Sequence, residues 1–180
     1  MAVDVAPLLR PGTRSPLMLL WFVGPAIAIV WLVFRSPALD YRVVAAGAVL
    51  PLAEAVAGGP RVLHTLLGAV LALGVVMLGT RNRRLVRRRW LGLPIGLFLH
   101  LALDGSFTRA ELFWWPFLGW ALGPGGLPEL DRPMVVIVAL EVLGAAACWW
   151  CWRTFGLDDP ARRAVMVRTG QVDRTLLPPG

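Results

Sequence analysis

The sequence contains no lysine and little charge of any kind. Charged residues make up 16% of the 180 residues, whereas they approach about a quarter of an ordinary soluble domain. All 18 basic residues are arginines, and the formal net charge is +7. Hydrophobic residues make up 57% of the chain, and the mean hydropathy is +0.67. This composition excludes an ordinary soluble domain and predicts a polytopic membrane protein.

The arginines lie between apolar segments, above all in 81–89, where there are six. Basic residues concentrated in a short connection between apolar segments are typical of the cytoplasmic side of a membrane protein. We therefore expect Arg81 to Arg89 to contact anionic lipid headgroups, and we do not expect nucleic-acid binding.

Other features are scarce or missing. The sequence has no internal repeat, no glycine-rich phosphate loop and no sustained heptad. Its two cysteines form Cys148-Trp-Trp-Cys151 at the end of an apolar run. A dithiol redox pair is one interpretation, but such pairs normally lie between a strand and a helix in soluble folds. The favoured interpretation is that both thiols pack as small apolar groups.

Apolar runs predict an all-α transmembrane bundle. A spanning helix needs about 20 apolar residues, and four segments approach that length: Leu17 to Phe34, Val62 to Thr80, Trp90 to Thr108 and Met134 to Trp152. Arg10 and Arg14 precede the first, which is too long for a cleavable signal core and is interpreted as a retained signal anchor. Val43 to Ala57 and Leu112 to Leu122 are shorter and contain Pro51 and Pro116. We expect these two to be half-helices or interfacial segments.

The arginine distribution predicts an orientation. With 81–89 in the cytoplasm, four crossings place both termini in the cytoplasm and the two short segments on the outer side. If Val43 to Ala57 spans instead, the N-terminus lies outside with its two arginines, which fits the arginine distribution less well. Residues 1–152 then form the membrane domain. Residues 153–180 form a cytoplasmic tail, either disordered or with one short helix that Asp159 caps and Pro160 begins.

Ionisable residues inside apolar runs are candidate functional groups. A charge near the bilayer centre costs at least about 2.5 to 3.5 kcal/mol. The only two histidines, His64 and His100, both lie in such runs. Asp104 follows His100 by four residues, which places both side chains on one face of a helix. The predicted topology carries His64 and Asp104, with Glu54, toward the outer side. Such a set suits zinc, which is commonly held by three nitrogen or oxygen ligands with an open fourth position.

Each residue also has a simpler explanation. A histidine can hydrogen-bond between helices, and Asp104 can cap a helix end before Gly105 and Ser106. Glu141, inside the last apolar run, is as well explained by an ion pair with Arg109 or Arg132 as by a ligand role. The run Trp114-Trp115-Pro116 is typical of an interfacial aromatic anchor.

Four stretches resemble, in order and spacing, the bacterial inner-membrane family of membrane-bound metal-dependent hydrolases. They are Gly47-Ala-Val-Leu-Pro51-Leu-Ala-Glu54, His64-Thr65, His100-Leu-Ala-Leu-Asp104-Gly105 and Phe113-Trp-Trp-Pro116. The resemblance covers about 45–122 and implies metal-ligand roles for Glu54, His64, His100 and Asp104. The chain departs from the family at two expected ligand positions, at Leu52 and near Gly59. The resemblance therefore implies either a mononuclear site or a related fold without metal.

These observations favour an integral-membrane hydrolase that acts on a lipid or a lipid-linked phosphate or ester at the outer side. Its catalytic residues would be Glu54, His64, His100 and Asp104. They would hold one divalent metal, zinc or alternatively manganese, with Glu54 as fourth ligand or general base. One alternative is a non-catalytic scaffold that uses the arginine loop. Another is a transporter or channel subunit with a cation path through Glu54, Asp104 and Glu141.

Overall fold

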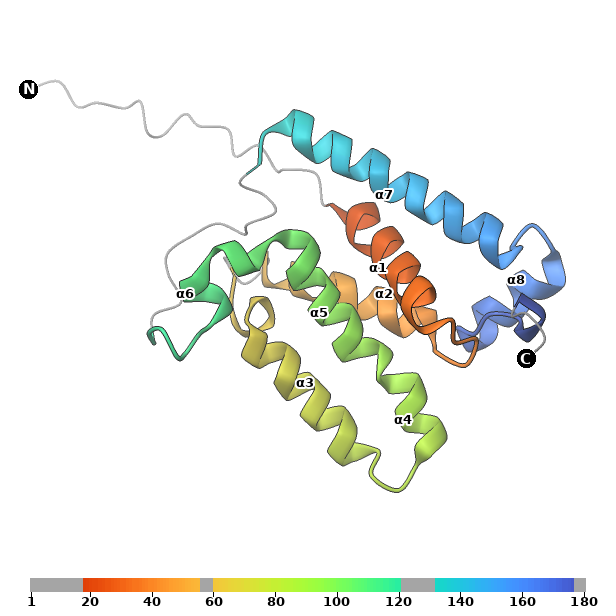
Figure 1. Cartoon of the computed structure of the whole chain (residues 1–180), viewed down its shortest axis with the longest axis horizontal. Helices are drawn as coiled ribbons and strands as arrows, with labels where there is room; N and C mark the ends of the chain where they lie inside the picture. Colours follow the sequence, from red (N-terminus) through yellow and green to blue (C-terminus); the bar gives the residue numbers. More distant parts are fainter. Residues whose placement is uncertain (1–17, 56–59, 121–131, 177–180) are drawn as a thin grey trace, which may run out of the picture.

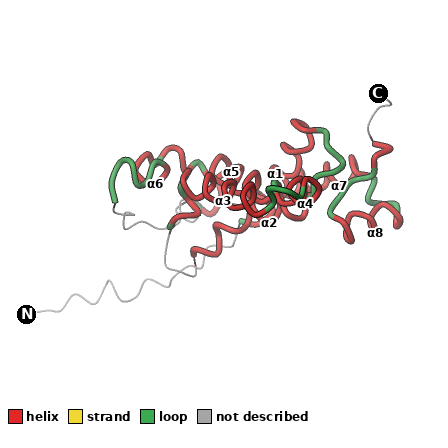
Figure 2. The backbone as a smooth tube through the Cα atoms, turned by 90° about the horizontal axis from the view of Figure 1, so that it is seen from below, coloured by secondary structure: helices red, strands yellow, loops and turns green. Residues whose placement is uncertain are grey.

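The computed structural model describes residues 18–55, 60–120 and 132–176, and every regular element within these ranges is helical. Figure 1 shows the helices packed side by side, and Figure 2, turned by 90°, shows that the bundle is shallow in the third direction. In both views α6 and α8 lie at opposite ends. The predicted all-α class is confirmed.

The helical elements follow the apolar runs closely. In chain order they are α1 (Leu19–Phe34), α2 (Tyr41–Val49), η2 (Leu50–Ala55), η3 (Val62–His64), α3 (Leu66–Gly79), α4 (Arg84–Trp90), α5 (Gly92–Asp104), η4 (Ser106–Thr108), α6 (Ala110–Phe113), α7 (Met134–Phe155), α8 (Pro160–Thr169) and η5 (Arg174–Leu176).

Within the described ranges, α7 is the one helix that is long and apolar enough to cross a membrane; α1 and α3 are apolar but shorter. The predicted span Met134 to Trp152 is thus a single helix, which continues to Phe155 and ends at Gly156 in the left-handed conformation. The three other predicted spans are helical over most of their length but are shorter than expected or divided. Of the predicted segment Leu112 to Leu122, only the first two residues are helical, as the end of the short helix α6, and the last two lie outside the described ranges.

Close backbone contact joins α1 to α7. A Cβ atom on Gly24 would lie 2.4 Å from the carbonyl oxygen of Gly144, and one on Gly144 would lie 2.2 Å from the carbonyl carbon of Leu20. Cys148 and Cys151 pack at the same crossing, next to Gly24. Both thiols are free, and Cys151 is buried, as the packing interpretation predicts.

A second backbone contact joins α2 to α5. A Cβ atom on Gly47 would lie 2.2 Å from the carbonyl oxygen of Leu93, and one on Gly96 would lie 2.1 Å from that of Val44. Gly92, one turn before Gly96, faces Asp40 and Val44. Small residues spaced by four let two helix backbones approach in this way. The order of these contacts shows that α2 and α5 run in the same direction.

The direction of α2 corrects the predicted topology. Asp40, which precedes α2, forms an ion pair with Arg89 of the arginine-rich segment, whereas Ala48 and Glu54 contact the histidines at the other end of the bundle. The described part of this segment, Val43 to Ala55, therefore runs along the bundle beside α5 and is not confined to one end; residues 56 and 57 lie outside the described ranges. Since α1 leads into Asp40, α1 begins at the histidine end, opposite the arginine-rich end where α7 finishes. In the described residues, the start of α1 and the end of α7 thus lie at opposite ends of the bundle, whereas the predicted orientation placed them on the same side. Residues 1–17 lie outside the described ranges.

Asp40 connects α2 to α4 at the arginine end. Its side chain caps α2 by accepting from the backbone N–H groups of Arg42 and Val43. It also pairs with the guanidinium groups of Arg42, at 3.1 Å, and Arg89, at 2.8 Å. Burial alone would raise the pKa of Asp40, but the hydrogen bond and charge of Arg42, with the hydrogen bond from Arg89, hold it below its ordinary value. One arginine of the 81–89 segment therefore has a structural role.

The C-terminal segment folds back on the bundle. Asp159 caps α8 by accepting from the N–H of Ala161, and Pro160 is its first residue, as predicted. Beyond α8, the carbonyl oxygen of Gly170 accepts from the N–H of Tyr41 at 2.8 Å, and Val172 is buried in the main hydrophobic core. The described part of this segment is therefore packed against the connection between α1 and α2.

Glu141 of α7 caps a different helix. Its two carboxylate oxygens accept from the backbone N–H groups of Leu20, at 3.3 Å, and Trp21, at 3.2 Å, in the first turn of α1. These N–H groups have no partner within their own helix, and a negative charge is favourable there. This contact accounts for the acidic residue that the sequence placed inside an apolar run.

We expect Glu141→Ala to lower the free energy of unfolding by about 0.5 to 2 kcal/mol, the usual cost of losing a helix N-cap. Glu141→Gln retains one acceptor oxygen and should cost less. Thermal unfolding in detergent would measure both changes. Equal stability of Glu141→Ala and the parent protein would show that the contact does not stabilise α1.

Candidate metal centre

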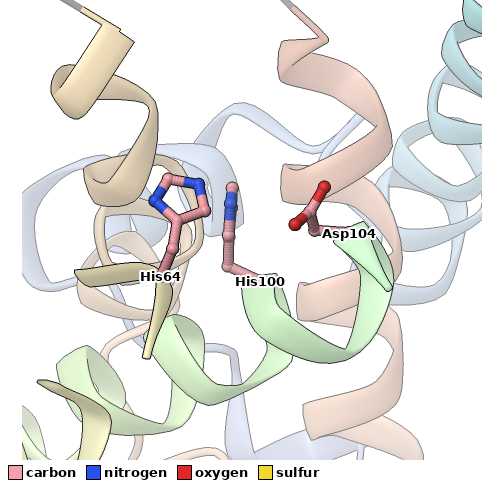
Figure 3. A group of neighbouring side chains, drawn as sticks. All are labelled: His64, His100 and Asp104. Atoms are coloured by element: carbon pink, nitrogen blue, oxygen red, sulfur yellow. The ribbon is translucent and has the colours of Figure 1, made fainter. Parts of the chain in front are cut away.

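Two histidines and an aspartate converge in the interior of the bundle. His64, His100 and Asp104 are each at least 98% buried, and one potential ligand atom from each lies within 4.8 Å of those of the other two. Figure 3 shows the side chains of His100 and Asp104 on one face of α5, with His64 entering from the segment before α3. Among the described residues this is the group of histidine, cysteine and acidic side chains that could hold a metal ion.

The position of His100 follows from the close contact between α2 and α5. One turn beyond Gly96, His100 reaches the end of α2, where its Nδ1 is 2.7 Å from the carbonyl oxygen of Ala48. A carbonyl oxygen only accepts, so Nδ1 carries the proton. Phe22 of α1 stacks on the imidazole, with 4.1 Å between ring centroids. The ring is thus oriented by three helices, and Nε2 is the ring nitrogen that could bind a metal.

His64 is oriented by a carboxylate. It ends η3 immediately before Thr65, whose side chain caps α3 by accepting from the N–H of Gly68 at 3.0 Å. Its Nδ1 lies 2.8 Å from Oε2 of Glu54. Glu54 in turn accepts from the backbone N–H of Arg61 at 2.6 Å and of Leu63 at 2.9 Å. Metal-binding histidines commonly donate their second ring nitrogen to a carboxylate or a carbonyl oxygen, and both patterns occur here.

Asp104 ends α5, and Gly105 follows in the left-handed conformation with φ of 77°. The hydroxyl of Ser106 donates to Oδ2 of Asp104. Arg132, which precedes α7, donates to the backbone oxygen of Asp104 and lies 3.8 Å from its Oδ1. A helix end, a hydroxyl and a guanidinium group therefore position this carboxylate.

The chemistry of these donors fits a zinc ion. Two imidazole nitrogens and one carboxylate oxygen form a three-ligand set that zinc enzymes use while keeping a fourth position for a reacting group. The set also fits manganese, though histidine nitrogen favours zinc. The structure brings together three of the four ligand positions predicted from the sequence. Glu54 lies behind His64 and is not part of the converging group.

Other predictions have different outcomes. Glu141 accepts hydrogen bonds from the backbone of α1. These contacts are neither the predicted ion pair with Arg109 or Arg132 nor those of a metal ligand. The sequence analysis did not find the contacts of Phe22, Ser106 and Arg132. Ser106 could have been suspected because a hydroxyl two residues after an aspartate often bonds to it. No sequence signal pointed to Phe22 or Arg132.

Comparison of the chain with protein-family models, curated proteins and solved structures finds no match. The site is therefore interpreted from its own geometry and chemistry.

Proposed function

We propose that this chain is an integral-membrane hydrolase in which His64, His100 and Asp104 hold one divalent metal ion, zinc by preference. The observation that carries the proposal is the convergence of these three buried side chains. In both histidines, Nδ1 is already hydrogen-bonded. A divalent cation shared by the three groups would offset the cost of burying a carboxylate beside two imidazoles. The resemblance to the membrane-bound metal-dependent hydrolases agrees with this proposal.

A divalent cation in this position would supply Lewis acidity toward a phosphoryl or carbonyl oxygen. The protein groups orient the ligands and exclude water: Glu54 holds His64, the Ala48 carbonyl holds His100, and Ser106 holds Asp104. Glu54 is thus assigned as a positioning residue. The substrate is proposed to be a lipid phosphate or a lipid ester, because the site lies among helices whose outer surfaces are apolar.

The proposal includes a multi-pass arrangement in the cell membrane. Large apolar side chains are exposed on several elements, including Val70 and Leu78 of α3 and Val135 and Val142 of α7. Soluble proteins seldom expose contiguous apolar surface on this scale. At one end, the exposed arginines among 81–88 would contact anionic headgroups at about 1 kcal/mol each. With that end in the cytoplasm, the metal centre would lie toward the outer side.

A direct test uses purified protein in phosphatidylcholine nanodiscs. The substrates are dodecyl phosphate, phosphatidic acid and a monoacylglycerol, and the readout is release of inorganic phosphate or fatty acid. We expect hydrolysis of at least one of the three, loss of it with a zinc chelator, and recovery when zinc is restored. Hydrolysis that is unaffected by chelation, or no hydrolysis by the zinc-loaded protein, would contradict the proposal.

The role of Glu54 gives a separate prediction. Glu54→Gln keeps the size of the side chain but removes the negative charge that orients and polarises His64. Loss of such a partner typically weakens metal binding about 10- to 100-fold. Competitive titration with a fluorescent zinc indicator would measure the change. If Glu54 is a ligand instead, the loss should equal that of His100→Ala; no change would exclude both roles. Glu111→Gln, at an exposed carboxylate on α6, is the control.

A further inference from the structure

An apolar groove runs between α1, α3 and α5. Its volume is about 450 Å³, which lies within the range of small-molecule sites. All of its lining residues are apolar, among them Val33 and Phe34 of α1, Leu66, Val70 and Leu73 of α3, and Phe98 of α5. Because no polar side chain lines it, a polar ligand would lose its hydrogen bonds to water there without replacing them. The groove therefore suits a hydrocarbon.

The groove begins beside the metal centre. Leu66 and Leu99 line it, and they lie two residues from His64 and one residue from His100 respectively. From Leu66 to Leu73 the groove follows α3 over about 10 Å, at 1.5 Å per residue, toward the arginine-rich end. Its axis thus leads away from the polar group into the apolar middle of the bundle.

A positively charged side chain, Arg132, lies at the metal-centre end of the groove. Arg132 lies at Asp104, where its guanidinium group is 3.8 Å from Oδ1 and its side chain is 23% exposed. A ligand with an anionic head and one alkyl chain would match the guanidinium at one end and the apolar walls at the other. The flat outer face of α7 offers apolar side chains too, but it has neither three helical walls nor a neighbouring polar site.

We propose that this groove binds one alkyl chain of the substrate lipid and so directs its phosphate or ester group to the metal centre. The direction of the phosphate or ester group to the metal centre rests on the proposed function. Binding of the alkyl chain in the groove does not require catalysis. Val33 and Phe34 of α1 and Val70 of α3 line the groove and are exposed, so a lipid in the proposed bilayer can reach it without first passing through water.

Two valines of α3 provide matched variants. Val70 lines the groove, whereas Val75 lies on the same helix outside it, and both are exposed, at 53% and 70%. In Val70→Trp the added ring fills the groove. Val75→Trp adds the same ring facing away from it. Neither valine belongs to the buried core, so both variants should fold.

The probe is dodecyl phosphate with a diazirine at the end of its chain, added to the protein in phosphatidylcholine nanodiscs. After illumination, cross-linked residues are mapped by mass spectrometry, with excess unlabelled dodecyl phosphate as competitor. We expect competable cross-links on α3 and α5 within the groove. They should fall about tenfold or more in Val70→Trp, since overfilling an occupied apolar site is strongly unfavourable, and remain unchanged in Val75→Trp.

Equal labelling of the groove and the outer face of α7, or undiminished labelling in Val70→Trp, would overturn the inference. The two proposals fail separately. Competable groove labelling by a protein that hydrolyses none of the test lipids would leave the groove assignment intact and refute the hydrolase. Zinc-dependent hydrolysis without groove labelling would support the hydrolase and refute the groove assignment.

Discussion

Replacing His100 with alanine is expected to abolish stoichiometric zinc binding and, with it, hydrolysis. His100 is the middle member of the converging group and is wholly buried, and without it only two ligands of the proposed three-ligand set remain. Loss of a directly bound ligand should exceed the 10- to 100-fold effect of losing a supporting residue. We expect zinc affinity to fall by more than about 100-fold. Metal analysis of the purified variant measures the loss.

Asp104→Asn tests the third ligand with almost no change in volume. It should also lose zinc, because an amide oxygen is a much weaker zinc ligand than a carboxylate. Asp158→Asn provides the matched control, since Asp158 is 63% exposed and pairs only with Arg153 and Trp152 among the described residues. Retention of one zinc per chain in Asp104→Asn and in His100→Ala would show that the group does not bind the metal.

Substituting Gly96 with alanine is expected to have the largest effect on the fold. The new Cβ atom would lie 2.1 Å from the carbonyl oxygen of Val44 and 2.8 Å from the backbone nitrogen of Ala48. Both neighbours are backbone atoms in α2, so the helices must separate. Overpacking a tight contact typically costs about 1 to 3 kcal/mol or more. His100 would also move away from the Ala48 carbonyl, so zinc affinity should fall together with stability.

Gly74→Ala is the matched control for this prediction. Gly74 lies in α3 and nothing would lie within 4 Å of a Cβ atom there. Since alanine is favoured over glycine in a helix by about 0.8 to 1.0 kcal/mol, Gly74→Ala should preserve or raise the unfolding temperature. Comparing the two variants in the same detergent separates helix propensity from packing. Similar unfolding temperatures for both would contradict the proposed close contact between α2 and α5.

The sequence predicted best those features that depend on local patterns. A long apolar run predicted α7, and Asp159-Pro160 predicted the start of α8. The four-residue spacing of His100 and Asp104 predicted their common face because both lie within one helix. These signals need no knowledge of which helices are neighbours.

Features that depend on the neighbours of a helix were missed. Pro51 was interpreted as the limit of a half-helix, but the chain continues through it as a 3-10 helix, η2, and reaches the histidines. That difference reversed the direction assigned to α1. The glycines that pack α2 on α5 are spaced suitably in the sequence, but the spacing alone does not tell which helix they face.

The roles of the acidic residues show the same limit. Glu54 and Glu141 are both carboxylates near apolar runs, yet one orients a histidine and the other caps α1. Sequence position gave both the same suspected role as ligands. Only their neighbours in three dimensions distinguish the two carboxylates. The same holds for Arg132, which contacts Asp104 although the two residues are far apart in the sequence.

Zinc K-edge X-ray absorption spectroscopy of the metal-loaded protein tests the central claim most directly. The account predicts one zinc per chain with two imidazole nitrogens and oxygen donors at about 2.0 to 2.2 Å, and loss of the imidazole signal in His100→Ala. Absence of bound zinc would contradict it. So would a sulfur shell at about 2.3 Å, which would place the metal at Cys148 and Cys151 instead.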